Sequence, residues 1–142
     1  MPYTPHLTSL DTAQYYITQL AKGREVETSK MHYLIYLTET TSLQHCHHPF
    51  HTDTFQKHNH HLPRAEKFSH ALSHYNTEHQ NLLHEGQNIG GTLQNITVED
   101  KEILNHTLQK YGQLPRNHLA EIIQQDIYFA STPPHRTIIF RN

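Results

Sequence analysis

The chain has 142 residues, a formal net charge of −2 with histidine neutral, and 17% charged residues, which predicts one domain of ordinary size over 1–142. It carries no block of lysine and arginine of the kind that neutralises phosphates, so nucleic-acid binding is excluded from the expected functions. The chain has a lone cysteine and begins unlike a signal peptide. It also has no apolar run near the roughly 18 residues of a membrane span. These features predict a cytoplasmic protein without membrane contact.

The first two predicted elements are helices. The first begins at Thr8, which with Asp11 has the spacing of a capping box, and continues with apolar residues at helical intervals. The second covers 27–40 and begins with a capping hydroxyl from Thr28 or Ser29. It is apolar on two sides, which predicts that it lies at the centre of the fold.

The rest of the chain predicts three more helices and little strand. The middle lacks a helical period, and "HTDTFQ" reads as one arm of a short hairpin. A third helix is expected from Pro63, a fourth over 96–112 with Thr97 as its cap and Gly112 just past its end, and a shorter fifth from Pro115. The expected fold is mainly α: a single compact domain of about five helices with a minor short-strand or hairpin element.

Two stretches resemble the Panacea domain, the SocA-like family of antitoxins and phage-associated proteins. The stretch "LDTAQYYITQLAKGREVETSKMHYLIYLTE" is similar to the opening of that domain, and "ITVEDKEILNHTLQKYGQLPRNHLAEI" is similar to a later stretch. The resemblance covers about 9–126 and leaves 127–142 as a tail, in which "RTIIF" reads as a short strand. The matching positions are Thr28 or Ser29, Lys30, Met31, Leu34, Tyr36, Ile96, Thr97, Glu99, Asp100, Leu104, Tyr111, Gly112, Leu114 and Leu119.

The resemblance implies a protein-binding function without a cofactor. Members of the family mostly neutralise a cognate toxin by direct binding, and some deliver it to a protease, so the implied partners are a toxin and a protease. The chain departs from the family after the hairpin, where "FQKHNHHLPRAEKF" replaces an aromatic residue and a Tyr-Gly-Pro-Val motif. Because loops carry recognition more often than scaffolds do, the expected partner contacts are in this stretch, at Phe55, His58, His60, His61, Leu62 and Pro63.

The sixteen histidines raise an alternative function, a His-rich metal-binding protein. Histidine and thiolate are good ligands for zinc, and "QHCHHPFH" holds four histidines beside Cys46. Adjacent side chains in an extended segment point to opposite faces, so only His45, His47 and His51 would converge there. A coding strand rich in A and C explains the same histidines, since 51 of the 142 residues are His, Thr, Gln or Asn. The stretch is therefore expected to be a surface loop without structural metal.

A second group of histidines lies on the third predicted helix. His70 and His74 recur with Glu66 and Glu78 at four-residue intervals, which places all four on one ridge. The ridge lies largely opposite the apolar residues of the same helix, so it is expected to face solvent.

Enzymatic activity is not expected. Cys46 among histidines is a candidate thiolate nucleophile, but no orienting group or oxyanion site is legible beside it. The chain also lacks a Gly-rich phosphate loop, HExxH and GxSxG.

Overall fold

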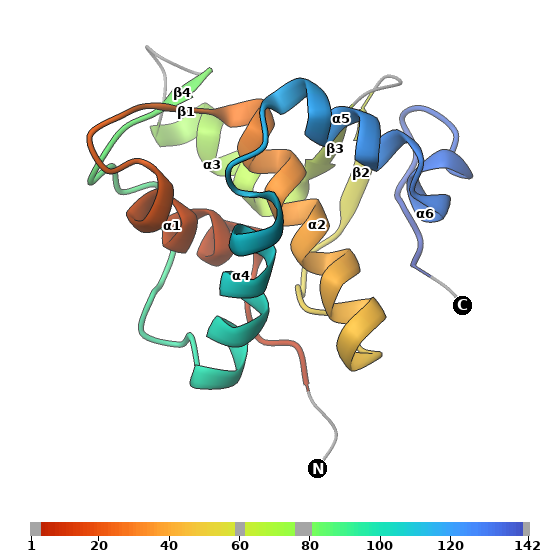
Figure 1. Ribbon diagram of the computed structural model, residues 1–142, viewed down its shortest axis with the longest axis horizontal. Helices are drawn as coiled ribbons and strands as arrows, with labels where there is room; N and C mark the ends of the chain where they lie inside the picture. Colours follow the sequence, from red (N-terminus) through yellow and green to blue (C-terminus); the bar gives the residue numbers. More distant parts are fainter. Residues whose placement is uncertain (1–3, 59–61, 76–80, 141–142) are drawn as a thin grey trace.

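The computed structural model describes residues 4–58, 62–75 and 81–140 and is mainly helical with two small sheets, as the sequence predicts (Figure 1). One hydrophobic core joins the elements, and it includes side chains from both ends of the described chain. Among the described residues, no helix is long and apolar enough to cross a membrane. The elements are α1 (Ser9–Leu20), β1 (Val26–Glu27), α2 (Thr28–Cys46), β2 (Phe55–His58), β3 (Leu62–Ala65), α3 (Glu66–Tyr75), β4 (Leu82–Leu83), α4 (Val98–Tyr111), α5 (Arg116–Gln124) and α6 (Ile127–Ala130).

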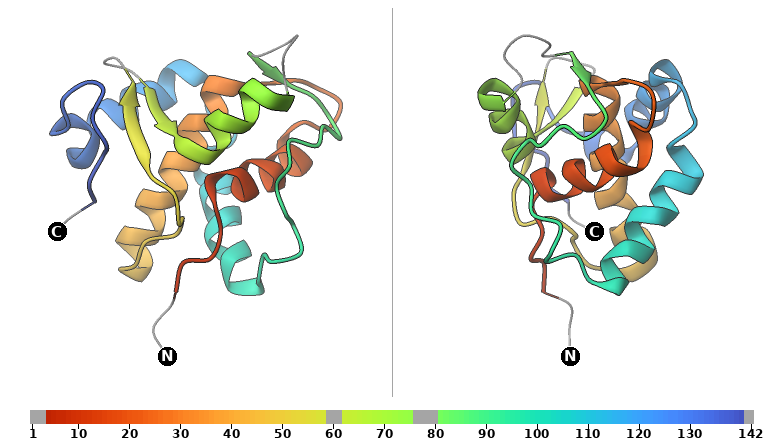
Figure 2. Two further views of the ribbon diagram at one scale, coloured as in Figure 1. Left: turned by 180° about the vertical axis from the view of Figure 1, so that it is seen from behind. Right: turned by 90° about the vertical axis from the view of Figure 1, so that its left-hand side faces the viewer.

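The predicted central helix is confirmed as α2, which is buried throughout 31–42 and packs against α1, α4, α5 and β3 (Figures 1 and 2). Its predicted start is wrong, because Glu27 is the N-cap and makes no side-chain capping bond. The helix also runs past residue 40 to Cys46 and stops at His47, whose φ of 61° is left-handed. Thr41 and Ser42 of the extra turns are buried, and Ser42 Oγ donates to the carbonyl of His48 at 2.8 Å, so packing against the following segment supports the helix beyond its apolar pattern.

The predicted capping box of α1 and the predicted Thr97 cap of α4 are confirmed, and the cap of α4 is also a full capping box. Thr8 Oγ1 accepts the N–H of Asp11 at 3.2 Å, and the Asp11 carboxylate accepts the N–H of Thr8 at 3.0 Å. Thr97 and Asp100 repeat the exchange at the start of α4, at 3.1 and 2.9 Å. These reciprocal bonds satisfy amides that would otherwise lack helical partners.

The end of α4 differs from the prediction. Gly112 is the C-cap residue itself and keeps a right-handed φ of −60°, so it does not supply a left-handed turn. A Cβ there would lie 2.6 Å from the carbonyl oxygen of Leu108, so the close approach of two backbone segments requires glycine.

The predicted hairpin is confirmed, but its second strand replaces the expected start of the third helix. β2 and β3 pair antiparallel, with Phe55 opposite Ala65 and Pro63 opposite Lys57. Pro63 therefore belongs to β3, and α3 begins only at Glu66. Figure 2 shows the hairpin and α3 side by side on one face of α2.

The first turn of α3 is capped by side chains from elsewhere in the chain. The N–H of Lys67 donates to the Asp53 carboxylate at 2.9 Å, and the N–H of Phe68 donates to Ser9 Oγ at 3.1 Å. Ser9 is itself bound to Asp53 through its backbone N–H at 2.7 Å. The start of α3 is thus set by long-range contacts, which a local reading of the sequence cannot detect.

The C-terminal segment closes the outer edge of β2. The N–H of Lys57 donates to the carbonyl of Arg136 at 2.9 Å, and that of Ile138 donates to Phe55 at 2.8 Å. Only Thr137 forms a bridge there, opposite Gln56, so the predicted strand is an extended segment with a single bridge. The four-residue α6 before it was not expected from the sequence.

Candidate functional site

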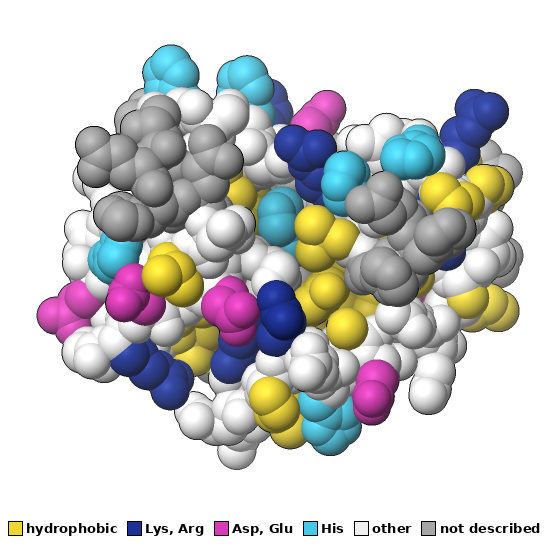
Figure 3. All heavy atoms as spheres, turned by 90° about the horizontal axis from the view of Figure 1, so that it is seen from above, with side chains coloured by type: hydrophobic (Ala, Val, Ile, Leu, Met, Phe, Trp, Pro, Cys, Tyr) yellow, Lys and Arg dark blue, Asp and Glu magenta, His cyan; other side chains and the backbone are white. Residues whose placement is uncertain are grey.

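A groove lies between the β2–β3 hairpin and α3, over the stretch in which partner contacts are expected. It contains a pocket of about 400 Å³ that continues past Arg64 into a second pocket of about 350 Å³. Seen from above, histidine, cationic and hydrophobic side chains gather on this face (Figure 3). The described residues that line the larger pocket are His32, His58, Leu62, Arg64, Ser69, Leu72, Ser73 and Asn81.

The predicted contact residues divide into three groups. His58 and Leu62 are half-buried and line the larger pocket. Phe55 and Pro63 are buried instead: Phe55 is 1% exposed among aromatic rings of the core, and alternation along β3 turns Pro63 inward. His60 and His61 lie outside the described residues.

Arg64 separates the two pockets and was not predicted as a site residue. Its side chain is exposed on β3, and its Nε–H donates to Ser69 Oγ on α3. A guanidinium has five N–H donors. The bond to Ser69 uses the Nε–H, so it restricts the orientation of the guanidinium and leaves the N–H groups of the two terminal nitrogens for other partners. Arg64 lies within the quoted stretch "FQKHNHHLPRAEKF", but sequence alone does not distinguish it from other surface arginines.

His32 forms the floor of the larger pocket. It is buried on α2, and its Nδ1 accepts the N–H of Ala65 at 3.2 Å, so the base holds β3 against the central helix. Burial, with the positive charges of Arg64 and His58, lowers the pKa of His32 to about 3. The ring is therefore neutral at pH 7.

A second group of polar side chains is buried beneath the histidine-rich stretch. His51 Nδ1–H donates to Glu39 Oε1 at 2.8 Å, and His51 Nε2 lies 2.8 Å from Thr12 Oγ1. Glu39 also accepts the backbone N–H of Phe50 at 3.1 Å and that of His51 at 3.0 Å. The group joins α1, the last turns of α2 and the segment after it.

The order hydroxyl, imidazole and carboxylate is that of a hydrolase triad, but here the hydroxyl is enclosed. Thr12 is 0% exposed, Glu39 is 3% exposed and His51 is 6% exposed. A nucleophile must reach its substrate, and Thr12 in this conformation reaches only His51. The arrangement therefore supports a role in stabilising the fold. Because the three residues lie on separate segments of the chain, no local sequence pattern predicts that they meet.

The stretch "QHCHHPFH" is only partly the surface loop that was expected. His45 and Cys46 form the last turn of α2, and Phe50 and His51 are buried. The backbone N–H groups of Phe50 and His51 donate to the buried Glu39 carboxylate, and these bonds hold the two residues in the core. His45 and His47 are exposed, as the predicted surface loop requires. The prediction is wrong for His51, which is buried.

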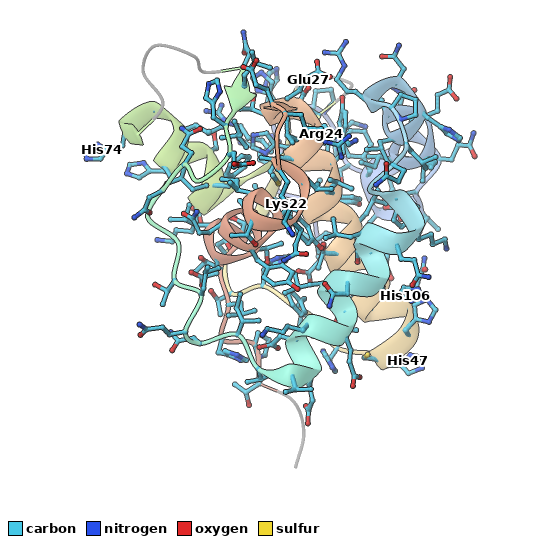
Figure 4. All side chains as sticks on the ribbon, turned by 60° about the vertical axis from the view of Figure 1, so that its left-hand side comes forward. Lys22, Arg24, Glu27, His47, His74 and His106 are labelled. Carbon is cyan, nitrogen blue, oxygen red and sulfur yellow. The ribbon has the colours of Figure 1, made fainter. Side chains whose placement is uncertain are left out.

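The candidate metal ligands are spread over the molecule. His47 lies near the end of α2 and His74 on α3 at the opposite side (Figure 4). Glu66, His70 and His74 are exposed, which confirms the predicted solvent ridge for its described members. Among the described residues, no group of three or more His, Cys, Asp or Glu is placed to hold a metal ion.

One histidine pair was missed by the sequence reasoning. His45 at the end of α2 and His106 on α4 have ring centroids 5.0 Å apart. Both side chains are exposed. They lie 61 positions apart in the chain. Their proximity results from the packing of α2 against α4, which the sequence pattern does not reveal.

Comparisons with protein-family models, with curated proteins and with solved structures gave no match. The resemblance to the Panacea domain consequently stays a prediction from the two quoted stretches.

Proposed function

We propose that the protein is a protein-binding module resembling the Panacea-type antitoxins, and that its partner docks in the groove between the β2–β3 hairpin and α3. The observation that supports this most is the open pocket of about 400 Å³ beside the stretch in which the chain departs from the family. Its lining combines half-buried leucines with an exposed arginine. Protein interfaces combine an apolar centre with an enrichment in arginine.

The buried polar groups favour binding over catalysis. Each buried side-chain nitrogen and oxygen among the described residues has a hydrogen-bond partner. The group with the order of a triad, Thr12, His51 and Glu39, is enclosed, and the described residues of the groove form no comparable arrangement. The mechanism would be stoichiometric: the groove covers a surface of the partner, a toxin if the resemblance holds, and delivery to a protease would follow from the same complex.

The test is affinity capture from the native host with matched surface variants. Leu62→Asp places a charge in the groove, and Val98→Asp places the same charge on α4, where Val98 is 76% exposed. An acidic residue in the first turn of a helix is well tolerated, so the second variant is a folded control. We expect one host protein to co-purify with the wild type and with Val98→Asp and to be lost with Leu62→Asp. Retention by both variants would contradict the proposal.

A second candidate function, metal binding, is favoured by one contact. Two imidazoles bound to one tetrahedral zinc ion at roughly 2.0–2.1 Å would have their ring centroids about 5 Å apart, and His45 and His106 are separated by 5.0 Å. The measurement is the metal content of untagged protein from minimal medium, with His106→Ala beside the exposed control His118→Ala. One equivalent of metal, lost only in His106→Ala, would favour this function over the first.

A further inference from the structure

We infer that the groove recognises a carboxylate on an acidic segment of the partner protein, with Arg64 as the residue that binds it. The inference rests on the proposed function and names the chemistry of its partner. Three features of the described residues support it: the anchoring of Arg64, the charge of the pocket around it and the apolar surface beside it.

The anchoring prepares Arg64 to bind a planar anion. Its Nε–H donates to Ser69 Oγ, and Ser69 is only 9% exposed and lies in the first turns of α3. The side chain lines both pockets, so the guanidinium stands where they meet. Arginine binds carboxylates through two parallel N–H donors, and a fork that is already oriented loses less entropy on binding.

Among the described residues, the larger of the two pockets beside Arg64 has no acidic side chain in its lining. No described carboxylate forms an ion pair with Arg64. Glu66 lines the smaller pocket. Arg64 and His58 line the larger pocket together with His32, whose pKa is lowered first by burial and then by these two side chains. A carboxylate in the larger pocket would therefore be attracted without displacing an existing partner.

The apolar lining indicates a peptide. Leu62 on β3 and Leu72 on α3 are half-buried and line the same pocket as Arg64. A free inorganic anion gains nothing from these side chains, whereas a peptide with an apolar residue next to an acidic one would bury surface on them. Hydroxyl and amide groups at Ser73 and Asn81 complete the lining.

The test is an amide NMR titration of the labelled full chain with the peptide acetyl-Leu-Glu-Leu-Glu-amide and its glutamine counterpart. We expect the glutamate peptide to shift signals of Arg64 and of the neighbouring residues on β3 and α3, and the glutamine peptide to bind at least tenfold more weakly. Arg64→Ala should lower the affinity for the glutamate peptide at least tenfold, because charge-assisted bonds to a guanidinium are lost. Arg136→Ala, a change at an exposed arginine outside the larger pocket, should leave the affinity unchanged.

Two further measurements separate the alternatives. Arg64→Lys keeps the charge but loses the fork, so binding as tight as wild type would overturn the role of the anchored guanidinium. Inorganic phosphate as a third probe should bind more weakly than the glutamate peptide; tighter binding of phosphate would overturn the assignment to a peptide. If neither peptide binds while Leu62→Asp still abolishes capture of the host protein, this inference fails and the proposed function stands. If capture is also unaffected, both fail.

Discussion

His32 is a base held neutral inside the protein, and its pKa has a consequence for stability. The pKa is about 3 in the folded chain, lowered mainly by burial and then by Arg64 and His58, against about 6.5 for a solvated histidine. Between these values the unfolded chain binds a proton that the folded chain does not. The stabilisation is therefore complete above pH 6.5 and is lost as the pH falls from 6.5 towards 3, by about 1.4 kcal/mol per pH unit.

The substitution His32→Asn tests this directly, because asparagine Oδ1 can accept the N–H of Ala65 as Nδ1 does. We expect the free energy of unfolding of the wild type to fall between pH 7 and pH 4.5 by about 2–3 kcal/mol more than that of the variant. Urea unfolding at both pH values measures it, with the exposed His118→Asn as control. Parallel losses in wild type and His32→Asn would show that another group causes the acid sensitivity.

Glu39 is the acceptor for three N–H groups, two from the backbone and one from the ring of His51. Glu39→Gln removes the charge and turns an amide group towards one of these donors. We expect a loss of roughly 2–4 kcal/mol in the free energy of unfolding, since breaking a buried charged network leaves donors unsatisfied. The exposed Glu121→Gln on α5 is the matched control and should stay within about 0.5 kcal/mol of wild type. Equal effects of the two changes would rule out a structural role for this network.

At the scale of elements, α4 is the helix whose sequence specifies it most completely. Thr97→Ala should cost about 1 kcal/mol, because the capping box with Asp100 is lost. Leu104→Ala should cost about 2–5 kcal/mol, because the side chain is 0% exposed and its removal leaves a cavity. Thermal and urea unfolding measure both, and two equal and negligible effects would contradict the packing of α4.

The start of α3 depends on Asp53, which accepts the N–H groups of Ser9 and Lys67. Asp53→Ala should loosen α3 while leaving α4 intact, because no described bond joins Asp53 to α4. Hydrogen exchange of the amides in Glu66–Tyr75 is expected to rise about tenfold or more, equivalent to about 1.4 kcal/mol, with Val98–Tyr111 as the internal control. A uniform rise in both helices would mean that the change destabilises the whole fold.

Local signals explain which elements were predictable. The capping boxes at Thr8 and Thr97 use residues three positions apart, so their spacing can be recognised in the sequence alone. The start of α3 and the last turns of α2 are set by contacts from Asp53 and Glu39 with distant segments, and both were mispredicted. The two apolar stripes of α2 predict the burial of 31–38, whereas the burial of the polar residues at 39–42 depends on contacts with other segments.

At the scale of the whole molecule, the sequence predicts partner contacts at the hairpin but does not single out Arg64 or His32. The departure from the family pattern pointed to the hairpin, where the structure places a groove, and His58 and Leu62 line it. Arg64 and His32 were missed because their roles depend on the packing of β3 between α2 and α3. The number of histidines in a stretch does not predict a metal site, because histidines four positions apart can differ in burial: His47 is exposed and His51 is buried.

The claim that a partner protein docks in the groove is tested most directly by crosslinking in the native host. A photoreactive benzoylphenylalanine would replace Ser73, an exposed residue that lines the groove, and in a second variant Val98, an exposed residue on α4. We predict that illumination links a single host protein to the Ser73 variant and nothing to the Val98 variant. An adduct formed from Val98, or none from Ser73 while both variants stay folded, would contradict the claim.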